Sequence, residues 1–341
     1  MKNWRTSSTR RKRDKKIIFL ILLVLLPLSA LLSICCGSVR IAPAQVFHAL
    51  LGLPGDRVQT DIVLLARLPR TCGCLLAGMA LAVSGAVIQS VLANPLAAPN
   101  IIGVNAGAGM AVTLCSALLP ASAALIPGAA FIGALAAVLL VLLISEKTGA
   151  SKMTLVLSGI AVSGIFTALI DAIVTFVPDA LNGYTDFRIG GFSNLAMSRL
   201  TPAVWMILAA FVLILSLSNE LDILMLGSET ASSLGLNVRF FRVLLLGLAA
   251  ALAGAAVSFS GLLGFVGLLV PHIMRRLVGE SSGELIPACA LGGAVVLTLC
   301  DLVSRMVFAP YELPVGIVLS LLGGPFFIWL LLRQRGGRTH D

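Results

Sequence analysis

Two pairs of charged residues have a spacing suited to contacts between guanidinium and carboxylate groups. Arg67 and Arg70, in the run Arg-Leu-Pro-Arg, place two guanidinium groups three residues apart. A guanidinium donates paired hydrogen bonds to a carboxylate, so this pair could grip acidic groups. Asp301 and Arg305 are four residues apart, which lets their side chains meet on one helix face. The alternative for the first pair is membrane anchoring, because Arg near the end of a span often reaches lipid headgroups.

Catalytic chemistry has little support in the sequence. No Gly-x4-Gly-Lys-Ser/Thr run occurs, so the chain is not expected to hold ATP phosphates through such a loop. No cluster of His, carboxylate and nucleophile stands out, and we predict no catalytic residues. Cys72 and Cys74 have no His or second Cys pair nearby, which argues against a metal site. We therefore expect a protein that is not an enzyme and has no cofactor of its own.

Small and polar residues interrupt the apolar sequence between residues 85 and 107. Gly85, Gln89, Asn94 and Pro95 belong to this stretch, and Leu96 follows them. Irregular backbone at membrane depth persists only where it is buried in protein or lines a cavity. The stretch predicts part of a pore or gate, and tight packing through small residues is the alternative.

A second such stretch covers residues 261–276. It contains Gly264 and Gly267, and Pro271 and His272 follow within an apolar run. A histidine in a membrane can carry protons, but a single one is more often a hydrogen-bonded structural group. We expect this stretch to shape the same pathway.

The segment from Glu220 to Arg242 is mixed and amphipathic. Ser228 could cap a short helix and Gly235 could end it. This pattern predicts two short helices on the cytoplasmic face, with Leu and Met exposed unless a partner covers them. A helix lying on the lipid surface is the alternative.

The elements that position these residues belong in a bilayer. The chain is 58% hydrophobic and 11% charged, and residues 71–145 contain no Asp, Glu, Lys, Arg or His. These runs are apolar on every face, unlike the alternating strands of a β-barrel. The net charge of +9 comes largely from a basic tail before residue 17, and no aromatic and basic interleaving accompanies it. We predict an all-α polytopic membrane protein with no nucleic-acid partner.

About ten spans fit the hydropathy pattern. They are expected at 17–36, 71–92, 96–118, 122–144, 153–177, 201–219, 240–260, 262–277, 284–305 and 313–332. The basic tail places the N-terminus in the cytoplasm, and ten spans return the C-terminus there. The first span is expected to stay uncleaved. We expect a cytoplasmic tail at 1–16, one transmembrane domain at 17–333 and a second tail at 334–341.

Together these stretches closely resemble the FecCD-like permease family, the membrane subunits of type II ABC importers for iron-siderophore, haem and cobalamin. The resemblance covers roughly residues 60–333, and the order and spacing of its motifs are specific. The motifs are Arg67-Leu-Pro-Arg70, Gly85 through Gln89, Asn94-Pro-Leu96, Leu226-Gly through Leu234-Gly-Leu236, Gly264-Phe-Val-Gly-Leu, Pro271-His272, Asp301, Glu312-Leu-Pro314 and Gly316.

The resemblance implies a multi-pass subunit of the bacterial cytoplasmic membrane that dimerises around a central pathway, with a copy of itself or a paralogue. Two separate cytoplasmic ATPase subunits would bind the ATP, and an extracytoplasmic substrate-binding protein would deliver the cargo. Membrane lipid surrounds the assembly. An iron-siderophore chelate is the expected cargo, and haem or cobalamin is the alternative.

The resemblance also implies roles for individual residues. Arg67, Arg70 and Arg305 would receive acidic residues of the binding protein. Asn94, Leu96 and Ser151 would lie at the cytoplasmic gate. The 220–238 loop would seat in the ATPase through Leu226, Gly227, Glu229, Ala231, Leu234, Gly235 and Leu236. The pathway or its supporting structure would include Gly85, Gln89, Pro95, Gly264, Gly267, Pro271 and His272. Residues 187–194 depart from the Trp-rich segment usual at that place.

An ion-coupled secondary transporter is the rival interpretation. Such a protein needs carboxylates inside the membrane, and Asp171 and Asp301 are the obvious candidates.

Overall fold

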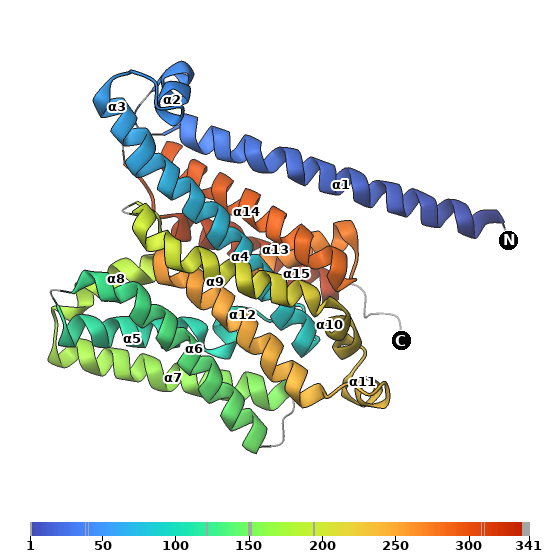
Figure 1. Ribbon diagram of the computed structural model, residues 1–341. Coiled ribbons are helices and arrows are strands. Elements are labelled where there is room, and N and C mark those ends of the chain that lie inside the picture. Colours follow the sequence, from blue (N-terminus) through green and yellow to red (C-terminus); the bar gives the residue numbers. More distant parts are fainter. Residues whose placement is uncertain are drawn as a thin grey trace.

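The chain forms a bundle of long helices (Figure 1). The computed structural model describes residues 2–335, apart from 38, 40, 121, 149–151, 194, 308 and 310. These residues contain no strand, and the all-α prediction is confirmed. The longer helices are α1 (Lys2–Cys35), α4 (Leu68–Leu92), α5 (Val104–Leu118), α6 (Ile126–Lys147), α7 (Lys152–Phe176), α9 (Met197–Ser216), α12 (Val238–Ser260), α13 (Val266–Val278), α14 (Ser282–Met306) and α15 (Val315–Arg335).

Shorter helices connect these elements. They are α2 (Pro43–Leu50), α3 (Arg57–Asp61), α8 (Ala180–Ile189), α10 (Ser218–Met225) and α11 (Ser228–Ser233), with a π-helix η1 (Ile62–Arg67) and 3-10 turns η2 (Pro99–Ile102) and η3 (Ala123–Leu125). Each of the ten predicted spans has a long helix in its place. Seven helical stretches in the described residues are long and apolar enough to cross a membrane. Shorter apolar helices lie at α5 and within α15, and α13 has only 13 residues.

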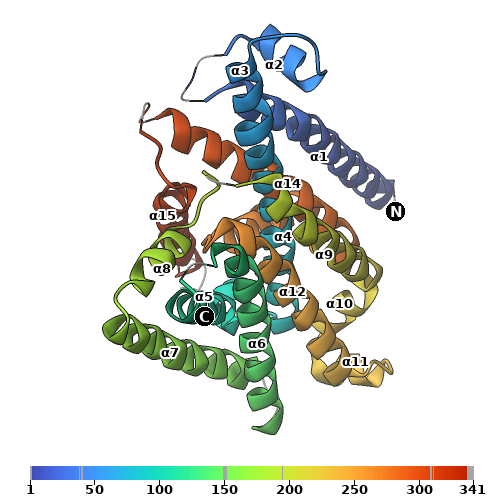
Figure 2. The same ribbon diagram turned by 60° about the vertical axis from the view of Figure 1, so that its left-hand side comes forward.

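Helix α4 lies at the centre of the bundle, packed against α14, α12 and α13 (Figure 2). Most of its residues are buried, and many are Gly, Ala or Ser, which let neighbouring backbones approach closely. A Cβ added to Gly85 would overlap the carbonyl group of Gly267 on α13. Helix α4, which begins directly after Arg67 and contains Arg70, is therefore packed closely on several sides by other helices.

The predicted break near Gly261 is present between α12 and α13. Gly261 has a φ of +67°, and Phe265 is also left-handed at +65°. Two hydrogen bonds hold this irregular backbone: Leu262 N–H donates to the Phe187 carbonyl, and Gly191 N–H donates to the Ser260 carbonyl. Pairing of this kind satisfies polar groups that lipid could not.

Two helix starts and one additional helix are among the differences from the sequence prediction. Helix α1 begins at Lys2 rather than 17, so its helix includes the basic tail. The span expected from 96 begins at Val104, because residues 94–103 form turns and η2 and end at Gly103, with a φ of +89°. Helix α8 was not predicted, since its sequence is only weakly apolar.

The bundle has two distinct ends (Figure 1). The start of α1 lies at the right-hand end with α10 and α11, whereas α2 and α3 lie at the opposite end. The last turn of α14 lies close to the start of α4, as the contacts of Arg70 below demonstrate. The two Arg motifs thus share one end of the fold, and the amphipathic 220–238 loop is at the other.

Candidate functional site

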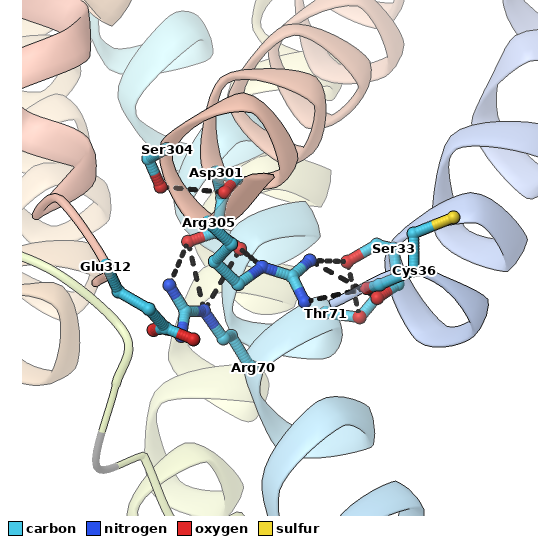
Figure 3. A network of polar contacts seen from close by, with 8 residues as sticks. All are labelled: Ser33, Cys36, Arg70, Thr71, Asp301, Ser304, Arg305 and Glu312. Carbon is cyan, nitrogen blue, oxygen red and sulfur yellow. Dashed lines mark hydrogen bonds and ion pairs between the residues drawn. The ribbon is translucent and has the colours of Figure 1, made fainter. Parts of the chain in front are cut away.

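An acidic and basic cluster, made by Arg70, Asp301, Arg305 and Glu312, occupies the end of the bundle near α3 (Figure 3). Arg70 Nε lies 3.1 Å from both carboxylate oxygens of Asp301, and its Nη2 lies 3.0 Å from Oδ1. Arg70 Nη1 also donates to Glu312 Oε2 at 2.6 Å. One guanidinium thus joins α4, α14 and the segment before α15.

The predicted i,i+4 pair on α14 is present. Arg305 Nε lies 3.0 Å from Asp301 Oδ2, so this carboxylate, with none of its surface exposed, is shared by two arginines. Arg305 also donates to the Ser33 hydroxyl at 2.9 Å and to the Cys36 carbonyl at 3.1 Å. The cluster therefore reaches the end of α1 (Figure 3).

Arg67 is buried beside this cluster but has different partners. Its Nη1 donates to the carbonyls of Ile34 and Cys35, each at 2.8 Å, and its Nη2 to the Val39 carbonyl. These bonds fix the chain where it leaves α1. Carbonyl groups satisfy the donors of Arg67 without neutralising its charge.

The structure brings Arg67, Arg70 and Arg305 together, and all three are buried within this chain. Three guanidiniums face two carboxylates, of which the side chain of Glu312 is 30% exposed. The arrangement holds the end of the bundle together and leaves a positive balance there. Docking of an acidic partner on these residues stays a prediction. Glu312 was not predicted to belong to the acidic and basic cluster. The feature that could have indicated it is its place as an acidic residue between two predicted spans.

The predicted gate residues form a tight turn after α4. The Asn94 side chain accepts a hydrogen bond from Leu96 N–H at 2.9 Å, and Ala93 adopts a left-handed φ of +46° to end the helix. Leu96 is half-buried and Pro95 is exposed. Ser151 lies outside the described residues. The role of these residues as a gate stays a prediction.

Several of the predicted pathway residues lie at the contact of α4 with α13. Gly85 packs on Gly267, and Gln89 Nε2 donates to the Gly267 carbonyl at 3.3 Å. Gly264 has open space around it. Further along α13, Pro271 is buried, and the next residue, His272, stacks edge to face on Phe326 of α15 with ring centres 5.8 Å apart.

The 220–238 loop forms the predicted pair of short helices, α10 and α11. Gly227 and Gly235, with φ of +105° and +85°, begin and end α11. Ser228 is its first residue rather than its cap, and its hydroxyl accepts from Arg242 at 3.1 Å.

Leucines project from this helix pair. Leu226 and Leu234 are 61% and 62% exposed, whereas Ala231 is buried. Glu229 is exposed and Leu236 is half-buried against the core. An apolar surface of this kind suits a protein partner or lipid.

Comparison with known proteins identifies related sequences along almost the whole chain. The FecCD transport family matches residues 21–333. The chain is 36% identical to the Fe(3+)-citrate import system permease protein YfmE of Bacillus subtilis, over 95% of this chain and 97% of that protein. It is 38% identical to the hemin transport system permease protein HmuU of Yersinia pestis, over 93% and 96%. It is 36% identical to the vitamin B12 import system permease protein BtuC of Citrobacter koseri, over 98% and 100%.

A solved structure also has this fold. A metal-chelate type ABC transporter, described in an inward-facing conformation, superposes with a TM-score of 0.83 at 31% identity. The match covers 93% of this chain and 99% of that one. The predicted fold class is thereby confirmed.

Proposed function

We propose, from the premise that the chain belongs to the FecCD transport family, that it carries an iron-siderophore chelate across the bacterial cytoplasmic membrane. The chain is a permease subunit of an ABC importer of the metal-chelate, siderophore, haem or B12 type. The family match over residues 21–333 is the observation that carries the proposal. The iron-siderophore assignment is the finer step, supported by relatives named for ferric citrate and siderophores.

The energy would come from two separate ATPase subunits, and a second permease subunit would complete the pathway. The exposed Leu226 and Leu234, which directly follow α10 and α11, support a protein contact at this end. ATP-driven closure of the ATPases would move α10 and α11 as rigid bodies and switch the pathway between outward and inward openings. In this proposal residues 17–333 form one transmembrane domain with both tails in the cytoplasm.

An extracytoplasmic binding protein would dock at the opposite end, near Arg67, Arg70 and Arg305. The excess of guanidinium over carboxylate there supports attraction of an acidic surface. Glu312 is the most exposed acid of the cluster, so an incoming carboxylate would most easily replace it at Arg70.

The rival ion-coupled transporter finds no support in its two candidate carboxylates. Asp301 is already paired with Arg70 and Arg305, so its carboxylate oxygens are occupied by these two arginines. Asp171 is exposed on α7 within this chain. Neither carboxylate lines a described cavity.

Uptake of radiolabelled cargo, with iron or cobalt as the label, tests the proposal. Cells that lack their own ferric-chelate permeases would express the chain with its cognate ATPase and binding protein, and receive ferric siderophore, ferric citrate, hemin or cobalamin. We expect ATP-dependent uptake of a ferric siderophore. Uptake of hemin or cobalamin alone would replace the cargo assignment, and uptake without the ATPase would favour the rival.

Docking has a separate test. Arg67→Glu with Arg70→Glu should abolish uptake and binding-protein capture while the protein remains inserted. Arg188→Glu, on an exposed position of α8, is the matched charge reversal. Unchanged uptake in the double variant would refute docking at this cluster, while leaving the family assignment intact.

A further inference from the structure

A cavity of about 400 Å³ with several polar side chains in its lining lies at the other end of α4, where that helix meets α13 and the end of α10. It is lined by Gln89, Ala93, Asn94, Pro95, Met225, His272, Arg275, Arg276 and Glu280. Two arginines and a histidine thus face a single glutamate. This cavity is separate from the acidic and basic cluster, which begins 19 residues earlier on α4 at Arg70.

Several polar atoms in this cavity lack a hydrogen-bond partner among the described residues. Gln89 is 1% exposed, and its Oε1 accepts no hydrogen bond although its Nε2 donates to the Gly267 carbonyl. His272 Nε2 and Arg275 Nε are likewise buried without a partner. Buried polar atoms are seldom left unpaired, because each has lost its hydrogen bonds to water, so three of them at one cavity point to a polar ligand.

The types of these atoms specify the chemistry of the ligand. Arg275 and Arg276 supply positive charge, and arginine is well suited to phosphate oxygens. Gln89 Oε1 requires a donor, such as a hydroxyl group. The last turn of α13 would carry arginines in any case, because cations stabilise a helix C-terminus. That explanation leaves Gln89 Oε1 and His272 Nε2 without partners among the described residues.

We propose that this cavity binds a phosphate group whose neighbouring hydroxyl donates to Gln89 Oε1, as in the glycerol phosphate headgroup of phosphatidylglycerol. Arg275 and Arg276 bind the phosphate oxygens, and His272 Nε2 lies within the same lining. The cavity is at the end of the bundle with the basic start of α1, where our proposed topology places the cytoplasmic leaflet. Basic pockets between membrane helices on that side suit anionic headgroups. Free phosphate is the other source of the same chemistry.

Such a ligand would join the turn that contains the predicted gate residue Asn94 to helix α13. Asn94 and Pro95 lie in the turn after α4, whereas His272 and Arg275 lie on α13. A phosphate bound between them would hold the turn against α13. Anionic lipid would then stabilise one arrangement of this end of the protein.

The test measures binding to the full chain, purified from membranes in a neutral detergent. The probes are dioctanoyl phosphatidylglycerol, dioctanoyl phosphatidylcholine and inorganic phosphate, and native mass spectrometry reports occupancy. Asn94→Asp keeps the acceptor for Leu96 N–H but adds a negative charge to the lining, and Arg275→Gln removes a positive one. Arg239→Gln removes an exposed arginine outside the cavity, at the start of α12.

We expect saturable binding of phosphatidylglycerol that each cavity variant weakens by about tenfold or more and the control leaves unchanged. Phosphatidylglycerol binding that inorganic phosphate does not displace identifies lipid as the source. Saturable phosphate binding that displaces the lipid identifies free phosphate. The proposal is overturned if neither phosphatidylglycerol nor phosphate binds, or if phosphatidylcholine binds as well as phosphatidylglycerol. Equal binding by Asn94→Asp, Arg275→Gln and the unchanged protein also overturns it. This readout does not depend on the transported cargo.

Discussion

The buried polar groups at the two ends of α4 differ in whether the chain itself supplies their hydrogen-bond partners. At the start of α4, Arg70 is bonded to Asp301 and Glu312, and the nearby Arg67 and Arg305 have carbonyl, hydroxyl or carboxylate partners within the chain. At its last turn, Gln89 faces a cavity with an unpaired oxygen. The chain therefore supplies partners for the buried arginines at the start of α4, whereas a buried amide oxygen at its last turn has no partner among the described residues. The difference indicates where stability is concentrated and where a ligand or partner is required.

Removing the carboxylate of Asp301, which Arg70 and Arg305 share, should have the largest effect on the stability of this end. Asp301→Asn leaves Arg305 buried without an anion and leaves Arg70 with Glu312 alone, and breaking a buried pair costs about 3–5 kcal/mol. We expect a large loss of thermal stability in detergent. Asp171→Asn, at an exposed position, is the matched control. A midpoint within a degree of the unchanged protein would mean that the acidic and basic cluster does not hold the bundle.

An added methyl group in the middle of α4 should lower the stability of the protein. In Gly85→Ala the new Cβ overlaps the Gly267 carbonyl, and overpacking costs about 1–3 kcal/mol. Gly247→Ala on α12 has nothing within 4 Å and should be neutral or slightly stabilising. Thermal unfolding monitored by tryptophan fluorescence compares the two. Equal unfolding midpoints of the two variants would exclude close contact between the backbones of α4 and α13 as the connection between the two ends of α4.

The partly exposed acid should matter less than the buried one. Glu312→Gln removes an ion pair that is open to solvent on one side, and such pairs contribute about 0–1 kcal/mol. Its small effect should shrink further in high salt, since salt screens exposed charges. Stability curves at low and high salt provide the measurement. A loss as large as that of Asp301→Asn would contradict the ranking of the two acids.

The smallest change in stability is expected at α10 and α11. Replacing the exposed Leu226 and Leu234 by Asp should alter the free energy of unfolding by about 0.5 kcal/mol or less. ATP-dependent uptake should nevertheless fall by about tenfold or more, because the proposed ATPase contact loses its apolar anchors. Exposed Leu143 on α6, changed to Ser, serves as the control for general loss of apolar surface. Normal uptake in the double variant would remove these leucines from the contact.

Much of the fold could be predicted from local patterns. Apolar length and Gly breaks placed the helices, including the division near Gly261, because membrane spans must satisfy their own backbone. The i,i+4 spacing of Asp301 and Arg305 correctly predicted their contact. Contacts that depend on how the helices pack could not be predicted from local sequence patterns. Arg70, for example, contacts Asp301, which lies 231 residues later in the chain. Likewise, nothing in the sequence around Gln89 indicates that one of its amide atoms stays unpaired.

Helix α1 is fastened near both of its membrane ends to α14, by the ion pair of Lys15 with Glu284 and by the bonds of Ser33 and Cys36 with Arg305. Both connections span 269 or more residues of sequence. A ribosome adding about 5–20 residues per second delivers α14 roughly 15–50 s after α1. During synthesis the first helix must therefore persist in the bilayer without its main partner, and the basic segment at its start holds its orientation until the final helices arrive.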